Sequence, residues 1–206
     1  YPDWVGDGVV ERSNRILARL RRAADPAQRA ALADLPMWLR ADVGDVRLGL
    51  VHGDAQSLAG WGFAQAHLRD AAHRDLVRDW LHRAHVDAFA CTHTCLPVYQ
   101  GLRARVGGRR QWVLNNGATG MPNFAGDSAG LLTRIAVTPC DAHLRRFGVR
   151  VGAVHADAIA VVPDTEAWRH RFLRQWAAGT DAHASYFDRI VQGPSYALEE
   201  AVRVEE

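Results

Sequence analysis

The sequence predicts a mixed fold of the α/β (α+β) class, a β-sheet sandwich flanked by helices. Segments with a helical period open and close the chain, apolar segments typical of strands fill its middle, and one long amphipathic segment separates the first two strands. Three of the strands also end in polar loops that contain His or Gly. Such loops are where folds of this class place their binding sites.

The elements are expected in a definite order along the chain. They are helices over residues 9–22 (Val9, Ile16, Leu17 and Leu20 on one side) and 26–34, a strand over 46–51, a long helix over 64–84 (Leu68, Leu76, Trp80 and Leu81 apolar), strands over 86–91, 110–114, 130–137, 147–152 and 154–162, and helices over 165–177 and 181–192. We expect a single domain over 1–206, with 165–206 as a C-terminal helical extension.

Composition excludes several classes of function. The 206 residues are 48% hydrophobic and 23% charged with a net charge of +2, which indicates neither a specific nucleic-acid partner nor a membrane partner. All 25 basic residues are Arg, so Schiff-base and Walker-lysine chemistry are excluded for this chain. Three cysteines are too few for a disulfide framework, and no apolar run is long enough to span a membrane. The cytoplasm is therefore the expected location.

Three loops after strands hold the candidate chemistry. They are VHGD over 51–54, CTHTC over 91–95 and NNG over 115–117. A His that directly follows an apolar strand is held rigidly, and its neutral imidazole binds divalent metals well. His52 and His93 are therefore candidate metal ligands. The small residues and Gly of the third loop fit a close backbone approach to an anion.

The three loops resemble, in order, the later motifs of the calcineurin-like metallophosphoesterases. The segment LPMWLRADVGDVRLGLVHGD resembles the one that leads to the fourth motif of that family, with His52 as the ligand. The segment VDAFACTHTCLP resembles the G-H-x-H motif, with His93 at its first His. WVLNNGATGMP resembles the loop that follows, and the resemblance extends from about residue 30 to about residue 125.

The resemblance implies a four-layer metallophosphoesterase-like architecture and hydrolysis of phosphomonoesters or phosphodiesters. In that family two divalent transition metals (Mn, Fe or Zn) hold a bridging hydroxide that attacks phosphorus. His52 and His93 would ligate one metal, and Asn115, Asn116 and Gly117 would border a small-molecule phosphoester. No residue is assigned as the catalytic acid or base.

Cys95 departs from the family pattern, because it stands where the family has the second His of G-H-x-H. Cys is a good ligand for zinc or iron and a poor one for magnesium. Either the second metal tolerates sulfur, with Cys95 as its ligand, or that site is altered and Cys95 is a buried small residue. The alternation of Cys91, His93 and Cys95 leaves a structural zinc site open as a further alternative, although no fourth ligand is near in sequence.

The first three motifs of the family (D-x-H, G-D-x-x-D and G-N-H) are not found in order. Val5-Gly6-Asp7, Asp141-Ala142-His143 and Asp181-Ala182-His183 match fragments of them at the wrong places. We expect the motifs to precede Tyr1, so that the sequence covers the later part of a domain of ~250–280 residues whose N-terminal part is missing. Whether residues 1–206 are active alone stays open.

Two rival functions follow from the same residues. The fold with a degraded metal site can serve as a non-catalytic scaffold for protein interactions, and Cys95 in place of His fits that interpretation. An RNA-binding function is the least favoured of the three. The arginines are spread along the whole chain and the net charge is small, whereas RNA binding is typical of clustered basic residues. The aromatic-rich segment Trp168–Tyr196 favours core packing or a homo-oligomer formed through the C-terminal helices, with base stacking or a substrate mouth as alternatives.

Overall fold

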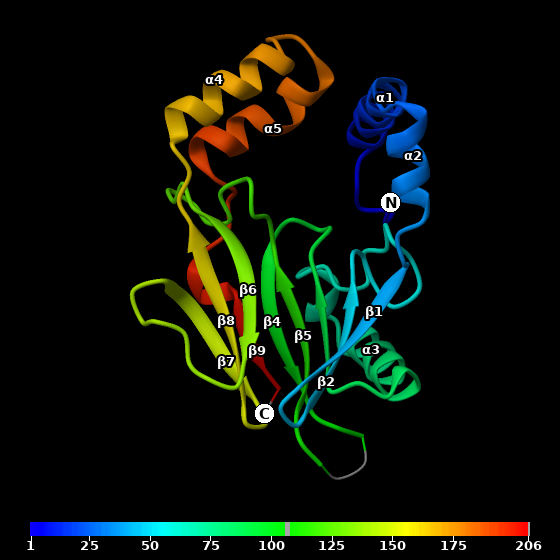
Figure 1. Ribbon diagram of the computed structural model, residues 1–206, viewed down its shortest axis with the longest axis vertical. Helices are drawn as coiled ribbons and strands as arrows, with labels where there is room; N and C mark the ends of the chain where they lie inside the picture. The colour runs from blue at the N-terminus through cyan, green and yellow to red at the C-terminus, as the bar shows by residue number, and fades with distance from the viewer. Residues whose placement is uncertain (106–107, 206) are drawn as a thin grey trace.

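Two β-sheets packed face to face, with helices around them, form the computed structural model, which describes residues 1–105 and 108–205 (Figure 1). The helices are α1 (Asp7–Ala23), α2 (Pro26–Ala33), α3 (Ala71–Ala84), α4 (Thr165–Gln175) and α5 (Asp181–Gln192), with short 3₁₀ turns at His67–Arg69 and Leu198–Glu200. The strands are β1 (Trp38–Val43), β2 (Val46–Val51), β3 (Ala88–Cys91), β4 (Pro97–Leu102), β5 (Gln111–Asn116), β6 (Gly130–Ala136), β7 (Arg145–Val151), β8 (Val154–Val161) and β9 (Val202–Val204).

The strand order confirms the predicted mixed α/β sandwich flanked by helices. The larger sheet has the order β1-β2-β3-β5-β4-β9, and the smaller has the order β6-β8-β7. Strands β2, β3 and β5 are parallel neighbours, with Leu50 opposite Ala90 and Ala90 opposite Leu114. Because their carboxyl ends reach the same edge of the sheet, the three loops that follow them lie close together.

The main hydrophobic core lies between the two sheets. It includes Leu48, Tyr99 and Leu114 from the larger sheet and Leu131 and Val154 from the smaller, all buried. A second cluster lies on the other face of the larger sheet, where α3 packs. The cluster comprises mainly Phe63, Leu68, Val77, Trp80, Leu81, Phe89, Val98, Leu102 and Val113. The larger sheet is therefore packed against the smaller sheet on one face and against α3 on the other.

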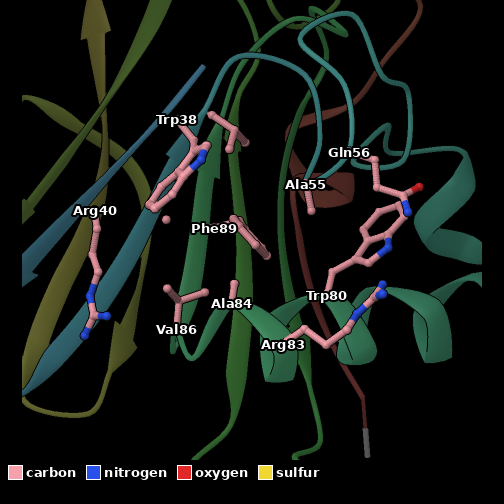
Figure 2. A pocket seen from close by; sticks show the side chains of 11 residues that line it. Trp38, Arg40, Ala55, Gln56, Trp80, Arg83, Ala84, Val86 and Phe89 are labelled. Atoms are coloured by element: carbon pink, nitrogen blue, oxygen red, sulfur yellow. The ribbon is translucent and has the colours of Figure 1, made fainter. Parts of the chain in front are cut away.

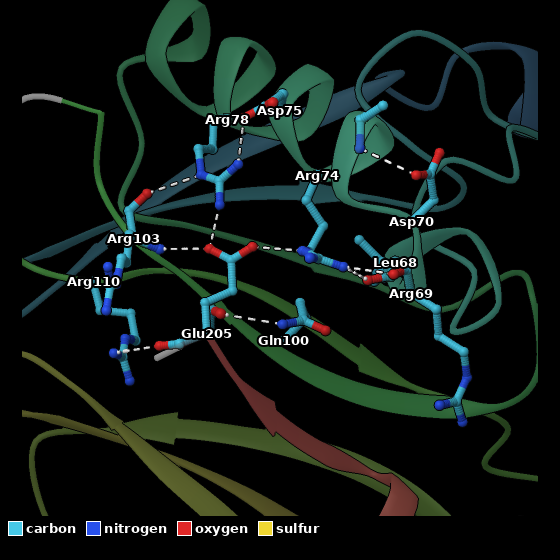
Figure 3. Close-up of polar contacts among 12 residues, drawn as sticks. Leu68, Arg69, Asp70, Arg74, Asp75, Arg78, Gln100, Arg103, Arg110 and Glu205 are labelled. Atoms are coloured by element: carbon cyan, nitrogen blue, oxygen red, sulfur yellow. Dashed lines mark hydrogen bonds and ion pairs between the residues drawn. The ribbon is translucent and has the colours of Figure 1, made fainter.

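The C-terminal strand is joined to α3 by one carboxylate (Figure 3). Glu205, just after β9, pairs with Arg74 and Arg78 of α3 and accepts a hydrogen bond of 3.0 Å from the Arg103 N–H. Arg110 donates to the Glu205 carbonyl at 2.8 Å. Burial alone would raise the pKa of Glu205, but the hydrogen bonds from Arg103, Arg78 and Arg74 outweigh it and lower that pKa.

Two predicted helices differ from those observed, one in where it begins and the other in which residues it buries. The long helix begins at Ala71 rather than at residue 64, because the Asp70 carboxylate accepts from the Ala72 N–H and caps it there. Leu76, expected on its apolar side, is 40% exposed. The first helix forms as predicted but buries only Ile16, while its other apolar residues (Val9, Leu17 and Leu20) are about half exposed. No helix among the described residues is long and apolar enough to cross a membrane.

Candidate functional site

Two histidines meet at the carboxyl edge of the larger sheet. His52 directly follows β2, and His93 lies two residues after β3. His52 Nε2 lies 3.2 Å from His93 Nδ1, and the ring centroids are 5.0 Å apart. Two nitrogens bound to one tetrahedral zinc at 2.0–2.1 Å lie about 3.3 Å apart. The observed separation is that of a hydrogen bond between the two rings, and two nitrogens that bind one metal ion would lie equally close. The two side chains therefore fit two ligands of the divalent metal that the sequence predicts.

His93 is held in an unusual backbone conformation. Its φ is 39°, in the left-handed region that residues with a side chain rarely adopt. Burial and the neighbouring His52 lower the pKa of His93, against the opposite effects of the Ala59 backbone and Asp54. Neutral imidazole is the form that binds metals. Backbone strain and a lowered pKa at one residue both indicate a functional position.

The loop after His52 is organised by Asp54. The Asp54 carboxylate accepts hydrogen bonds of 2.9 Å from the backbone N–H groups of Gln56, Ser57 and Gly62. A side chain at Gly60 would come within 2.0 Å of that carboxylate, so only Gly fits there. The Asp54 side chain is thus used to fold the loop.

Aromatic rings that the sequence analysis did not single out line the histidine pair. The Trp61 ring centroid lies 5.9 Å from that of His93, and Trp4 packs edge-on against Trp61 at 5.4 Å. Trp4 also donates from Nε1 to His67 at 3.2 Å. These contacts join residues more than 30 positions apart, so no local sequence signal could have found them.

Cys95 is not brought into a metal cage with the two histidines. Its Sγ donates to the His93 carbonyl at 3.2 Å, and its φ is 60°. Burial raises the pKa of Cys95, against the effect of nearby Arg189, and so favours the protonated thiol. Across residues 1–105 and 108–205 no three His, Cys, Asp or Glu side chains form a group that could hold a metal. Ligation by Cys95 stays a prediction.

Cys91 belongs to the core rather than to the site. It is 6% exposed and packs in the cluster under α3, and burial raises its pKa far above the ordinary value. β3 ends at Cys91, so the strand alternation on which a zinc site of Cys91, His93 and Cys95 depends does not continue. The described residues do not form that site.

The side chains of the third loop hold neighbouring loops together. Asn115 is fully buried, and its amide donates to the Phe63 carbonyl at 3.1 Å and to the Thr94 hydroxyl at 2.8 Å. Asn116 donates to the Leu131 carbonyl at 2.8 Å. Gly117 adopts a φ of 74° at a place where a side chain would lie 2.2 Å from an Asn123 oxygen. The amides of Asn115 and Asn116 thus donate within the fold, and the role of residues 115–117 at a substrate remains a prediction.

A small cavity lies where β2, β3 and β5 end, and β6 also lines it. Its volume is about 300 Å³, at the lower end of the range for small-molecule sites. It is lined by Val51, Ala90, Cys91, Thr92, Leu114, Asn116, Leu132 and Thr133. Val51 and Thr92 directly precede the two histidines in the sequence, but neither His52 nor His93 lines the cavity.

Comparison with solved structures gives distant likenesses, among them the two that follow. The hypothetical protein PH1004 from Pyrococcus horikoshii OT3 is 16% identical with a TM-score of 0.47, over 82% of this chain and 55% of that one. Vacuolar Protein Sorting 29 from Cryptosporidium parvum is 14% identical with a TM-score of 0.29, over 63% of this chain and 58% of that one. The chain thus spans little more than half the length of either. No family model and no curated protein matches.

Proposed function

We propose that this chain belongs to a metal-dependent phosphoesterase that hydrolyses phosphomonoesters or phosphodiesters, and that His52 and His93 bind one of its divalent transition metals. The observation that carries the proposal is the 3.2 Å contact between His52 Nε2 and His93 Nδ1 at the carboxyl edge of parallel strands. The order of the three loops, which resembles that of calcineurin-like metallophosphoesterases, supports it.

The residues of this chain would position the metal and the substrate. A bound divalent metal supplies Lewis-acid polarisation of a phosphoryl oxygen. His52 and His93 present their imidazole rings from the ends of two parallel strands, and the Asp54 carboxylate holds the loop that follows His52. The cavity at the ends of β2, β3 and β5 would hold the ester. Such centres also use carboxylates and additional His, and among the described residues no third side chain completes a metal-binding group with the pair. The Asp54 carboxylate, which is near His93, accepts hydrogen bonds from its own loop.

Metal titration tests the proposal. We expect the chain to bind Zn²⁺ or Mn²⁺ with one site per chain, measured by isothermal titration calorimetry. His52→Ala and His93→Ala should each weaken binding at least tenfold, because each removes one of two ligands. His170→Ala, an exposed His in α4, is the matched control and should leave binding unchanged. Failure of the unmodified chain to bind either metal would contradict the proposal.

The second candidate is a non-catalytic scaffold with the same fold. The absence of a third metal-binding side chain beside the pair, among the described residues, favours it. Hydrolysis of bis(p-nitrophenyl) phosphate and p-nitrophenyl phosphate in the presence of Mn²⁺ separates the two. Metal-dependent turnover that is lost in His52→Ala excludes the scaffold, whereas metal binding without turnover of either ester favours it.

A further inference from the structure

A groove lies on the α3 face of the larger sheet, between β1 and the helix (Figure 2). Its volume is about 480 Å³, within the range of sites for small organic molecules. It is lined by Trp38, Arg40, Gly49, Val51, Ala55, Gln56, Trp80, Arg83, Ala84, Val86 and Phe89. None of these residues belongs to the histidine pair, although Ala55 and Gln56 come from the loop that follows His52.

The groove exists because the helix does not reach the edge strand. In the antiparallel register Trp38 lies opposite Val51, and Arg40 lies opposite Gly49, so these side chains share the α3 face. A side chain at Gly49 would come within 2.6 Å of the Phe89 ring, and the absence of one keeps the floor of the groove low. Trp38 is 64% exposed at the rim.

The polar groups of the groove are complementary to an anion. Its lining contains two guanidinium groups, Arg40 and Arg83, and no carboxylate. Arg40 lies 3.9 Å from the exposed Asp42, a weak pair. No described residue gives Arg83 an ion pair, since the salt bridges found across residues 1–105 and 108–205 lie elsewhere. Arg83 is therefore free to bind a ligand.

The side chains at one end of the groove indicate where the charge of a ligand would lie. In Figure 2 the Arg83 guanidinium and the Gln56 amide are drawn on the same side of the groove, and both side chains line it. Trp80 also lines the groove and is 4% exposed. Its Nε1–H is buried and has no acceptor among the described residues, so Trp80 contributes the surface of its ring to the lining.

The geometry points to a binding site for a small aromatic anion in this groove, with the negative group at Arg83 and Gln56. The planar apolar body would lie against Trp38 and Phe89, because aromatic faces and aliphatic side chains form the rest of the lining. Carboxylates and sulfonates attached to a fused ring system are ligands of this chemistry.

Two probes of equal shape and different charge test the assignment. They are 2-naphthalenesulfonate, which carries one negative charge, and the neutral 2-naphthalenesulfonamide, titrated into the full chain by calorimetry. We expect one site for the sulfonate and at least tenfold weaker binding of the sulfonamide. Arg83→Gln should weaken the sulfonate about tenfold and leave the sulfonamide unchanged. Arg171→Gln, an exposed Arg of α4, is the matched control and should change neither.

The same sulfonate also tests where the ligand binds and whether the groove is independent of the proposed metal site. In the ¹⁵N-labelled chain the sulfonate should shift the indole signals of Trp80 and Trp38, the latter assigned by its loss in Trp38→Phe. His52→Ala and His93→Ala should leave sulfonate binding unchanged, which separates this site from the proposed metal site. Equal affinity for the two probes, an unchanged affinity in Arg83→Gln, or no binding of the sulfonate at 1 mM would each overturn the assignment.

Discussion

At the scale of single residues, three non-glycine residues of the described chain adopt a positive φ: His85, His93 and Cys95. Such a conformation is unfavourable for a residue with a side chain. His93 and Cys95 belong to the segment that carries the candidate metal ligand, where strain held by the surrounding fold is typical of functional sites. His85 is exposed and ends α3, a position that most helices give to Gly.

Replacing His85 with Gly should therefore stabilise the protein. We expect His85→Gly to raise the free energy of unfolding by about 0.5–1 kcal/mol, because Gly adopts φ 53° without steric conflict. Urea unfolding followed by circular dichroism measures the change. His82→Gly, three residues earlier inside the same helix and also exposed, is the control and should lower stability by about 1 kcal/mol. A loss of stability in His85→Gly would show that its side chain has a structural role.

Some residues of the candidate metal site could be predicted from the sequence, and others could not. His52 and His93 were predictable because each follows an apolar parallel strand, and parallel strands bring their carboxyl ends together. The hydrogen bonds of the Asn115 and Asn116 amides were not predictable, because their partners, the Phe63 and Leu131 carbonyls, are distant in sequence. A sequence pattern places a polar side chain in a loop but does not show which backbone group it binds.

At the scale of elements, the strands that the sequence analysis missed have identifiable causes. β4 (Pro97–Leu102) is buried along its whole length but contains Pro97 and Gly101, which are typical of turns. β9 (Val202–Val204) has three residues, too few to show a period of two. β1 (Trp38–Val43) exposes much of one side at the sheet edge and was interpreted only as the approach to β2. Burial on both faces removes the alternation on which strand prediction depends.

The attachment of β9 to α3 predicts an acid-sensitive stability. The pKa of Glu205 is lowered in the folded protein, so its contribution is complete above the unfolded-state pKa of about 4.3 and is lost as the pH falls through the lower folded value. Glu205→Gln should cost about 1–2 kcal/mol of unfolding free energy at pH 7, because Arg74 and Arg78 lose their counter-charge.

The difference between the native chain and Glu205→Gln should shrink as the pH is lowered from 7 to 3. Thermal unfolding at a series of pH values measures it. Glu199→Gln, an exposed acid in the neighbouring 3₁₀ turn, is the control and should have little effect at any pH. A difference that stays constant from pH 7 to pH 3 would show that packing, rather than charge, accounts for the effect of Glu205.

At the scale of the whole molecule, the larger sheet carries two candidate sites at different places. The histidine pair lies at its carboxyl edge, and the groove proposed for an aromatic anion lies on its α3 face. The loop that begins at His52 borders both, since Ala55 and Gln56 line the groove. The fold class was predictable from the order of helices and strands, whereas the groove was not, because it depends on where α3 ends relative to β1.

The central claim is that His52 Nε2 and His93 Nδ1 bind one metal ion together. Long-range ¹H–¹⁵N NMR of the histidine side chains during a Zn²⁺ titration tests it most directly, because the spectrum identifies which ring nitrogen of each His is bound. We predict that these two nitrogens shift together, reach their end point at one equivalent of Zn²⁺, and do so while the other histidines are unchanged. Unchanged signals from His52 and His93, or shifts confined to other histidines, would contradict the account.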